Sequence, residues 1–135
     1  MGFDQYHEPP DELPADTRTF ARMCASLTEE AEAIGWYEQR LAVEPDAAAR
    51  AIMTDAQTEE FKHFAMDLEY LLRRTPVWRE IAEGVLFSSG DIAARGDAAE
   101  EAADGDGGDG APGGAFGAAP ADGSLGIGSL RGATV

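Results

Sequence analysis

Apolar side chains recur along residues 16–43 at alternating steps of three and four, and no other feature constrains the fold as strongly. In an α-helix this spacing aligns the side chains in one stripe, which packs against neighbouring helices. We expect Asp16 to cap this helix and Pro45 to end it, because a proline inside a helix lacks the N–H group that the helix requires. The positions of the stripe are Phe20, Met23, Leu27, Glu30, Ile34, Tyr37 and Leu41.

A second long helix is predicted from about Asp46 to Arg74. Thr75 and Pro76 begin a third, shorter helix that we expect to reach about Phe87. Since only a few residues separate the two long helices, they should form an antiparallel hairpin. No strand pattern stands out, so the predicted fold class is all-α. The stripe positions of the second helix are Ile52, Ala56, Glu60, Phe64 and Leu71.

The two ends of the chain differ in composition from the helical domain, which we predict over residues 16–95. Residues 1–15 are rich in proline and acidic residues and are interpreted as an irregular arm. Residues 96–123 are rich in Gly, Ala and Asp and bury too little apolar area to offset the entropy of ordering the backbone. We therefore predict a flexible acidic linker there, as part of a disordered C-terminal tail. Residues 124–135 follow as a separate segment.

The net charge of −16 limits the partners that the chain can have. Nucleic acids and anionic membrane surfaces would be repelled, so we predict no nucleic-acid and no membrane partner, and cations are favoured. The one cysteine, Cys24, excludes an internal disulfide and suits a reducing compartment. No apolar run approaches the roughly 20 residues of a membrane span. We expect a cytoplasmic protein.

Ionisable side chains occupy stripe positions that should be apolar. Glu30 stands between Leu27 and Ile34, and Glu60 is followed three residues later by His63. Each could be structural: a glutamate near water, a core histidine, or part of a charged face. Together, however, they match helix-bundle di-iron sites, which combine Glu-x-x-His units with a Glu from other helices. Carboxylates with one histidine per metal suit iron or manganese better than zinc.

One chain then holds half a site, and this predicts pairing. Two copies related by a twofold axis would complete a four-helix bundle and supply four glutamates and two histidines around two metal ions. Tyr37 is either a hydrogen-bonding neighbour of a ligand or a core tyrosine. Glu29, Glu32 and Trp36 form either a site that attracts cations at the surface or an ordinary charged face.

Three segments together resemble the encapsulated ferritins, the ferritin-like cargo of encapsulin nanocompartments. They are "EEAEAIGWY" at residues 29–37, "EEFKHFAMDLEYLLRR" at 59–74 and "SLGIGSLRG" at 124–132. The resemblance implies a two-helix hairpin with a short extra helix. It also implies a ferritin-like four-helix bundle completed by a second copy, with a di-iron ferroxidase centre between the two chains. Such dimers assemble into a ring, typically a decamer.

The resemblance also assigns residues. It implies that Glu30, Glu60 and His63 bind the irons, with Tyr37 near the centre, and that Glu29, Glu32 and Trp36 form an outer metal site. Lys62 departs from the pattern, since relatives often have an acid there. We expect this lysine to face away from the ligands.

The last twelve residues resemble the peptide that loads cargo into an encapsulin shell. Leu125, Ile127 and Leu130 would be its apolar anchors, since an extended segment can place alternate side chains in the pockets of a partner. Without the resemblance, a frayed low-complexity end would be the simpler interpretation.

The function that we predict is oxidation of Fe²⁺ to Fe³⁺ with dioxygen, which supplies iron for storage inside the encapsulin shell. Two alternatives stay open. One is a non-catalytic helical assembly or adaptor protein, and the other is a di-metal oxidase or peroxidase that acts on another substrate.

Overall fold

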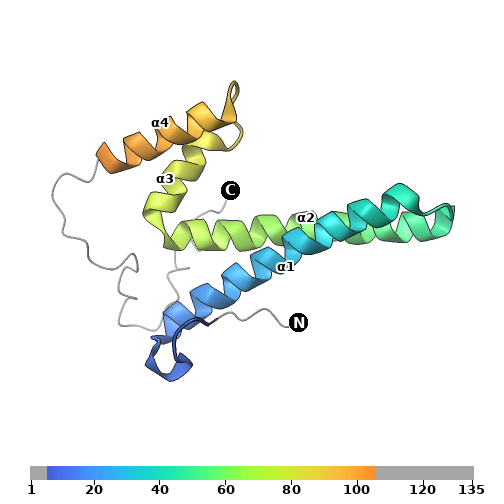
Figure 1. The fold of residues 1–135 in the computed structure, drawn as a ribbon, viewed down its shortest axis with the longest axis horizontal. Coiled ribbons are helices and arrows are strands. Elements are labelled where there is room, and N and C mark those ends of the chain that lie inside the picture. The colour runs from blue at the N-terminus through green and yellow to red at the C-terminus, as the bar shows by residue number, and fades with distance from the viewer. Residues whose placement is uncertain (1–5, 106–135) are drawn as a thin grey trace, which may run out of the picture. The chain divides into compact units, whose positions relative to one another are not determined.

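The computed structural model describes residues 6–105, and within this range every regular element is helical. A short 3-10 helix, η1, precedes four α-helices, as Figure 1 shows. The predicted all-α class is therefore confirmed. The chain divides after Leu71 into two compact units, the first formed by α1 with most of α2 and the second by α3 and α4. The elements are η1 Pro10–Glu12, α1 Ala15–Val43, α2 Ala47–Arg74, α3 Pro76–Val85 and α4 Ile92–Gly105.

Helix α1 begins two residues earlier than predicted, and Asp16 does not cap it. Pro14 occupies the cap position, and no side chain caps the free N–H groups. Proline restricts the backbone there to an extended conformation, so the helix starts directly after it. Asp16 lies in the first turn, where a carboxylate interacts favourably with the helix dipole. At the other end, the Glu44 N–H donates to the Arg40 carbonyl oxygen at 3.0 Å, just before Pro45.

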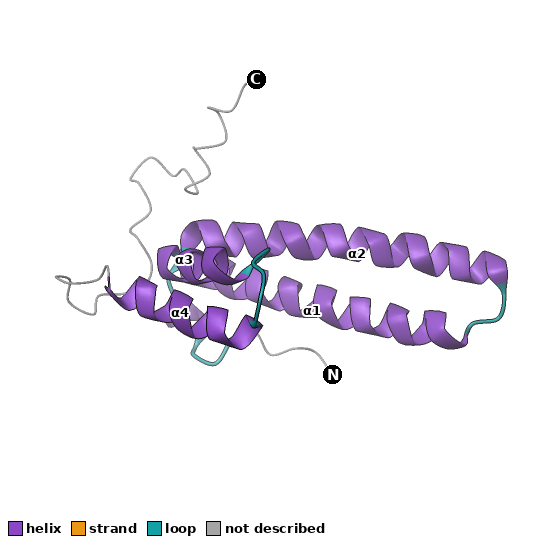
Figure 2. Cartoon of the chain, turned by 90° about the horizontal axis from the view of Figure 1, so that it is seen from above, coloured by secondary structure: helices purple, strands orange, loops and turns teal. Residues whose placement is uncertain are grey.

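The turn between α1 and α2 is closed by side chains as well as by the proline. The Asp46 carboxylate accepts a hydrogen bond from the Ala49 N–H at 2.8 Å and so caps α2, close to where the sequence predicts its start. Arg50 donates to the carbonyl oxygen of Leu41 and, at 3.3 Å, to that of Glu44. Figure 2 shows the result, two long helices side by side and joined by a short loop.

The hairpin of a single chain buries its stripes only in part. All seven α1 stripe positions are half-buried. On α2, Leu71 is fully buried, whereas Ile52 keeps 72% of its surface exposed and so lies outside the core, contrary to its predicted place in the stripe. Arg50, two residues earlier, still donates to the Leu41 carbonyl oxygen, so α1 runs alongside α2 at this level and the exposed side chain of Ile52 faces away from it. Large apolar side chains, including Phe61 and Met66, are also exposed, so the hairpin retains faces that other helices could cover.

The predicted third helix is present as α3, which starts after Thr75 with Pro76 in its first turn. It ends at Val85, two residues before the predicted end. Phe87 has a φ of +59°, which interrupts the right-handed helical backbone.

Helix α4 was not predicted, and it replaces the first part of the predicted linker. The structure continues as a helix through Gly105, whereas the composition predicts a flexible linker from residue 96. Alanine and glutamate, which dominate this stretch, favour helix, and Asp91 caps it by accepting from the Ala94 N–H at 2.8 Å. Ala99 is buried. The burial of Ala99 thus adds to the helix preference of alanine and glutamate, which the glycines and aspartates of this stretch outweighed in the sequence-based prediction.

The rest of the predicted linker and the segment 124–135, with Leu125, Ile127 and Leu130, lie outside the described residues. Residues 1–5 of the predicted arm also lie outside them. Of the helices between residues 6 and 105, none combines the length and hydropathy that crossing a membrane demands.

Candidate metal centre

The two long helices bring together the three side chains that interrupt the stripes. Glu30 projects from the middle of α1, and Glu60 and His63 project from one turn of α2. Each offers one ligand atom, a carboxylate oxygen or an imidazole nitrogen, and these atoms all lie within 4.8 Å of one another. The two glutamates are half-buried and the histidine is exposed. The group is therefore open to solvent, or to a partner, at the histidine edge.

The carboxyl groups of Glu30 and Glu60 shift each other's pKa in opposite directions. A hydrogen bond with Glu60, together with burial and the nearby negative charge of Glu60, raises the pKa of Glu30 to about 7. The same hydrogen bond, with the contact to His63, lowers the pKa of Glu60. Like charges this close do not ionise together readily, so the Glu30 carboxyl keeps its proton below about pH 7, and a bound cation would displace that proton.

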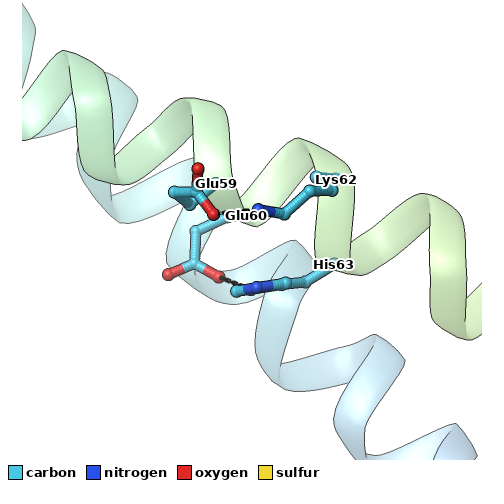
Figure 3. A network of polar contacts seen from close by, with 4 residues as sticks. All are labelled: Glu59, Glu60, Lys62 and His63. Carbon is cyan, nitrogen blue, oxygen red and sulfur yellow. Dashed lines mark hydrogen bonds and ion pairs between the residues drawn. The ribbon is translucent and has the colours of Figure 1, made fainter.

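The imidazole lies against the Glu60 carboxylate, as Figure 3 shows. His63 Nδ1 is 3.4 Å from Glu60 Oε2, which is a long contact for a hydrogen bond. The side chain of His63 is 45% exposed and that of Glu60 22% exposed. The histidine is thus held by one long contact and is open to solvent on the α2 face.

The donor set fits a divalent transition metal. Two carboxylates and an imidazole suit iron or manganese. Such ions take more ligands than the three that this group offers, so the set is incomplete in one chain.

Lys62 is engaged outside the ligand group. It pairs with Glu59 across one helical turn, and this hydrogen bond lowers the pKa of Glu59 (Figure 3). The lysine thus neutralises a neighbouring carboxylate that is not part of the group. This agrees with the expectation that Lys62 faces away from Glu30, Glu60 and His63.

Tyr37 and the three residues of the predicted outer site lie apart from the ligand group. The guanidinium of Arg40 lies 5.4 Å from the centre of the Tyr37 ring. Tyr37 is two turns along α1 from Glu30, about 10 Å. Glu29, Glu32 and Trp36 are exposed, and between residues 6 and 105 neither acid joins a cluster of three metal-ligand side chains. Trp36 instead lines a shallow depression with Gln39 and Arg40.

Sequence reasoning missed two residues near the centre. Asp67 follows His63 by one turn and is half-buried. Burial raises the pKa of its carboxyl group, and the interaction with His63 partly offsets this rise. Its spacing from His63 was the available signal. Gln57 is buried three residues before Glu60, and its side-chain amide contacts α1. No pattern in the sequence marks it.

The chain is similar to ferritin-like proteins across most of its length. The family described as EncFtn-like matches residues 5–89. An "Encapsulated ferritin-like protein" of Rhodospirillum rubrum is 43% identical over 127 residues, which cover 93% of this chain and 87% of the relative. A "Ferritin-like protein" of Thermotoga maritima is 44% identical over 89 residues, covering 66% of this chain and 78% of the relative. The crystal structure of protein ne0167 from Nitrosomonas europaea superposes with a TM-score of 0.65 at 38% identity, over 67% of this chain and 99% of the other.

Proposed function

Because the chain belongs to the EncFtn-like family of encapsulated ferritins, we propose that it is a ferroxidase that oxidises Fe²⁺ to Fe³⁺ with dioxygen. The observation that carries this proposal is the group formed by Glu30, Glu60 and His63 on one face of the hairpin. A carboxyl group with a raised pKa, beside a carboxylate and an imidazole, is a site where a divalent cation can replace a proton.

The site is completed by a second copy of the chain. Two copies supply four carboxylates and two imidazoles, and two Fe²⁺ ions bring charge +4 against −4. The filled site is therefore near neutral, whereas the empty site is a repulsive cluster. Metal binding and pairing should consequently favour each other. The half-buried stripes and exposed apolar side chains of the hairpin support such pairing, and pairs would assemble further into a ring.

Iron is the substrate of this reaction. Fe²⁺ binding displaces the proton of Glu30. Each of the two ions then gives one electron to dioxygen, which takes up two protons from solvent and is thereby reduced to hydrogen peroxide. The Fe³⁺ product leaves for storage. Glu29, Glu32 and Trp36 lie exposed on α1, where the negative acids attract Fe²⁺ from solution. Tyr37, two turns from Glu30 along α1, does not bind iron in this proposal and acts as a hydrogen-bonding neighbour of the site.

The chain works inside an encapsulin shell in the cytoplasm. This part of the proposal is supported by the Rhodospirillum rubrum relative, whose name includes "Encapsulated" and whose match covers 93% of this chain. Residues 124–135 would bind the shell protein through Leu125, Ile127 and Leu130, whose small apolar side chains alternate with Gly and Ser. Several such peptides on one ring would bind the shell cooperatively.

The proposal is tested by oxygen uptake and near-ultraviolet absorbance after Fe²⁺ is added to the full chain. Glu60→Gln keeps the size of the side chain but removes a charge-bearing ligand. Oxidation should fall by at least about 100-fold, toward the rate without protein, because the loss of even a group that supports a ligand costs about 10- to 100-fold. Glu59→Gln is the matched control, since Glu59 is the neighbouring glutamate and pairs with Lys62. It should keep the native rate. Equal rates in the native chain and Glu60→Gln would overturn the proposal and favour a non-catalytic assembly protein.

A further inference from the structure

Gln57 is the polar side chain that the fold buries within residues 6–105, with 8% of its surface exposed. A buried amide is tolerated when its hydrogen-bonding groups are satisfied. Its Nε2 donates to the carbonyl oxygen of Ile34 at 3.3 Å and to Oε2 of Glu38 at 3.1 Å. Both amide hydrogens are thereby used. The reverse orientation would place Oε1 against two acceptors, so the contacts fix which way the amide points.

These contacts join α1 to α2 next to the candidate metal centre. Gln57 precedes Glu60 by three residues, about 4.5 Å along α2, and Ile34 follows Glu30 by four residues, about 6 Å along α1. Since the helices are antiparallel, both displacements run in the same direction from the ligands. The amide therefore ties the two helices together within about one turn of the ligand group, on the side toward the hairpin turn.

The ligand group depends on how the helices are aligned, because Glu30 comes from α1 and the other two ligands from α2. A slip of one residue moves a side chain about 1.5 Å along the helix and turns it by about 100°. Apolar packing is non-directional and tolerates small slips, whereas a hydrogen bond to a backbone carbonyl does not. An amide that reaches the α1 backbone at this level fixes the alignment where it matters.

We propose that Gln57 is a positioning residue, which holds α1 and α2 in the alignment that brings Glu30, Glu60 and His63 within reach of one metal ion. This inference rests on the proposed function, since it takes those three side chains to be the ligands. Gln57 itself touches no metal and acts through the helices.

The test is a titration of the full chain with Co²⁺, followed by the visible absorption bands of the bound ion. Gln57→Met keeps the length of the side chain and removes both hydrogen bonds. We expect Co²⁺ binding to weaken by about 10- to 100-fold, the loss that is usual when a supporting contact of a metal ligand is removed. The band pattern should change as well, because the ligands no longer meet at the native positions.

Arg50→Met is the matched control. Arg50 also lies on α2 and also donates to an α1 carbonyl, that of Leu41, but at the hairpin turn, ten residues from Glu60. The loss of this bond should lower thermal stability and leave the affinity and the spectrum of Co²⁺ unchanged. Equal weakening in both variants would show that Gln57 acts only through general stability, and would overturn the inference.

The remaining outcomes separate the two proposals. If the native chain shows no saturable Co²⁺ binding, the proposed metal site fails. If it binds Co²⁺ and Gln57→Met binds it with the same affinity and spectrum, the metal site stands and the role of Gln57 is wrong. Should Gln57→Met not fold, Gln57→Asn decides, since its amide remains but is too short to reach both acceptors. The same weakening is expected for it, and native binding would overturn the inference.

Discussion

Glu30 keeps a proton that most glutamates lose well below neutral pH. Its hydrogen bond with Glu60 and its partial burial raise its pKa to about 7, from an ordinary value of 4.5. Between about pH 4.5 and pH 7, the folded chain without metal therefore keeps a proton on Glu30, whereas the unfolded chain releases it. The same proton competes with any cation for the carboxylate pair.

This proton makes the stability of the metal-free chain depend on pH. Because the folded state binds more protons, the contribution of Glu30 is fully present below about pH 4.5 and is lost as pH rises through about 7. Glu30→Gln stays neutral at every pH and should show a smaller fall in Tm between pH 5 and pH 8. Thermal unfolding in the presence of a chelator measures this. Glu59→Gln should fall as steeply as the native chain, and an equally steep fall in Glu30→Gln would contradict the assignment.

At the scale of single residues, the sequence predicts which side chains form the candidate metal centre, but not the contacts that fix the alignment of α1 and α2. Glu-x-x-His on one helix and a stripe glutamate on the other predict which helix faces carry Glu30, Glu60 and His63, and the short hairpin turn predicts that these faces meet. The metal that they bind stays a prediction. The contacts of Gln57 depend on how two helices align, which spacing within one helix does not encode.

Helices α3 and α4 approach each other closely because Gly84 has no side chain. A Cβ atom at position 84 would lie 2.6 Å from Cβ of Ala99, well inside the normal contact distance. Ala99 is buried in turn. Two small residues therefore set the spacing of the second unit.

Gly84→Ala should accordingly destabilise the chain, although alanine favours helix by about 1 kcal/mol over glycine. The clash with Ala99 exceeds this gain, and overpacking of this kind costs about 1–3 kcal/mol. Gly96→Ala in α4 is the control, because nothing lies within 4 Å of a Cβ there, and it should be neutral or stabilising. Urea unfolding measures both. A Gly84→Ala variant as stable as Gly96→Ala would contradict the packing described.

The helices are predictable from the sequence where local signals agree, and α4 shows where they do not. Alternating apolar steps and Pro45 suffice for α1 and α2, and Pro76 for the start of α3. In α4 the glycines and aspartates resemble a linker, while the alanines and the cap at Asp91 favour helix. The contact between Ala99 and Gly84 is visible only in three dimensions. The prediction that Asp16 caps α1 is wrong because Pro14 takes the cap position and Asp16 falls in the first turn.

At the scale of the whole molecule, one chain brings three candidate ligands together and leaves apolar side chains uncovered. The exposed fraction is 54% for Trp36, 50% for Phe61 and 61% for Met66, all on the hairpin. Large exposed apolar side chains commonly mark contact surfaces. A second copy that covers part of this surface would also provide the missing ligands, which links assembly to activity.

The proposed binding to the shell and the proposed oxidation of Fe²⁺ use different parts of the chain, so each can be removed without the other. Deletion of residues 124–135 should leave Fe²⁺ oxidation at the native rate, because the proposed ligands lie on α1 and α2. The same deletion should abolish packaging when the chain is produced together with an encapsulin shell protein and the shells are purified. The triple variant Leu125→Ser, Ile127→Ser, Leu130→Ser should behave like the deletion. Packaging that survives both changes would place the shell contact elsewhere in the chain.

The most direct test of the central claim is the number of Fe²⁺ ions that one chain oxidises rapidly. Increasing amounts of Fe²⁺ are mixed with the native chain in aerated buffer, and the near-ultraviolet absorbance of Fe³⁺ is followed by stopped flow. A site shared by two chains and holding two ions predicts a fast phase whose amplitude stops growing at one Fe²⁺ per chain. A fast phase that saturates at two ions per chain would place a complete site in each chain. The absence of any saturable fast phase would contradict the account.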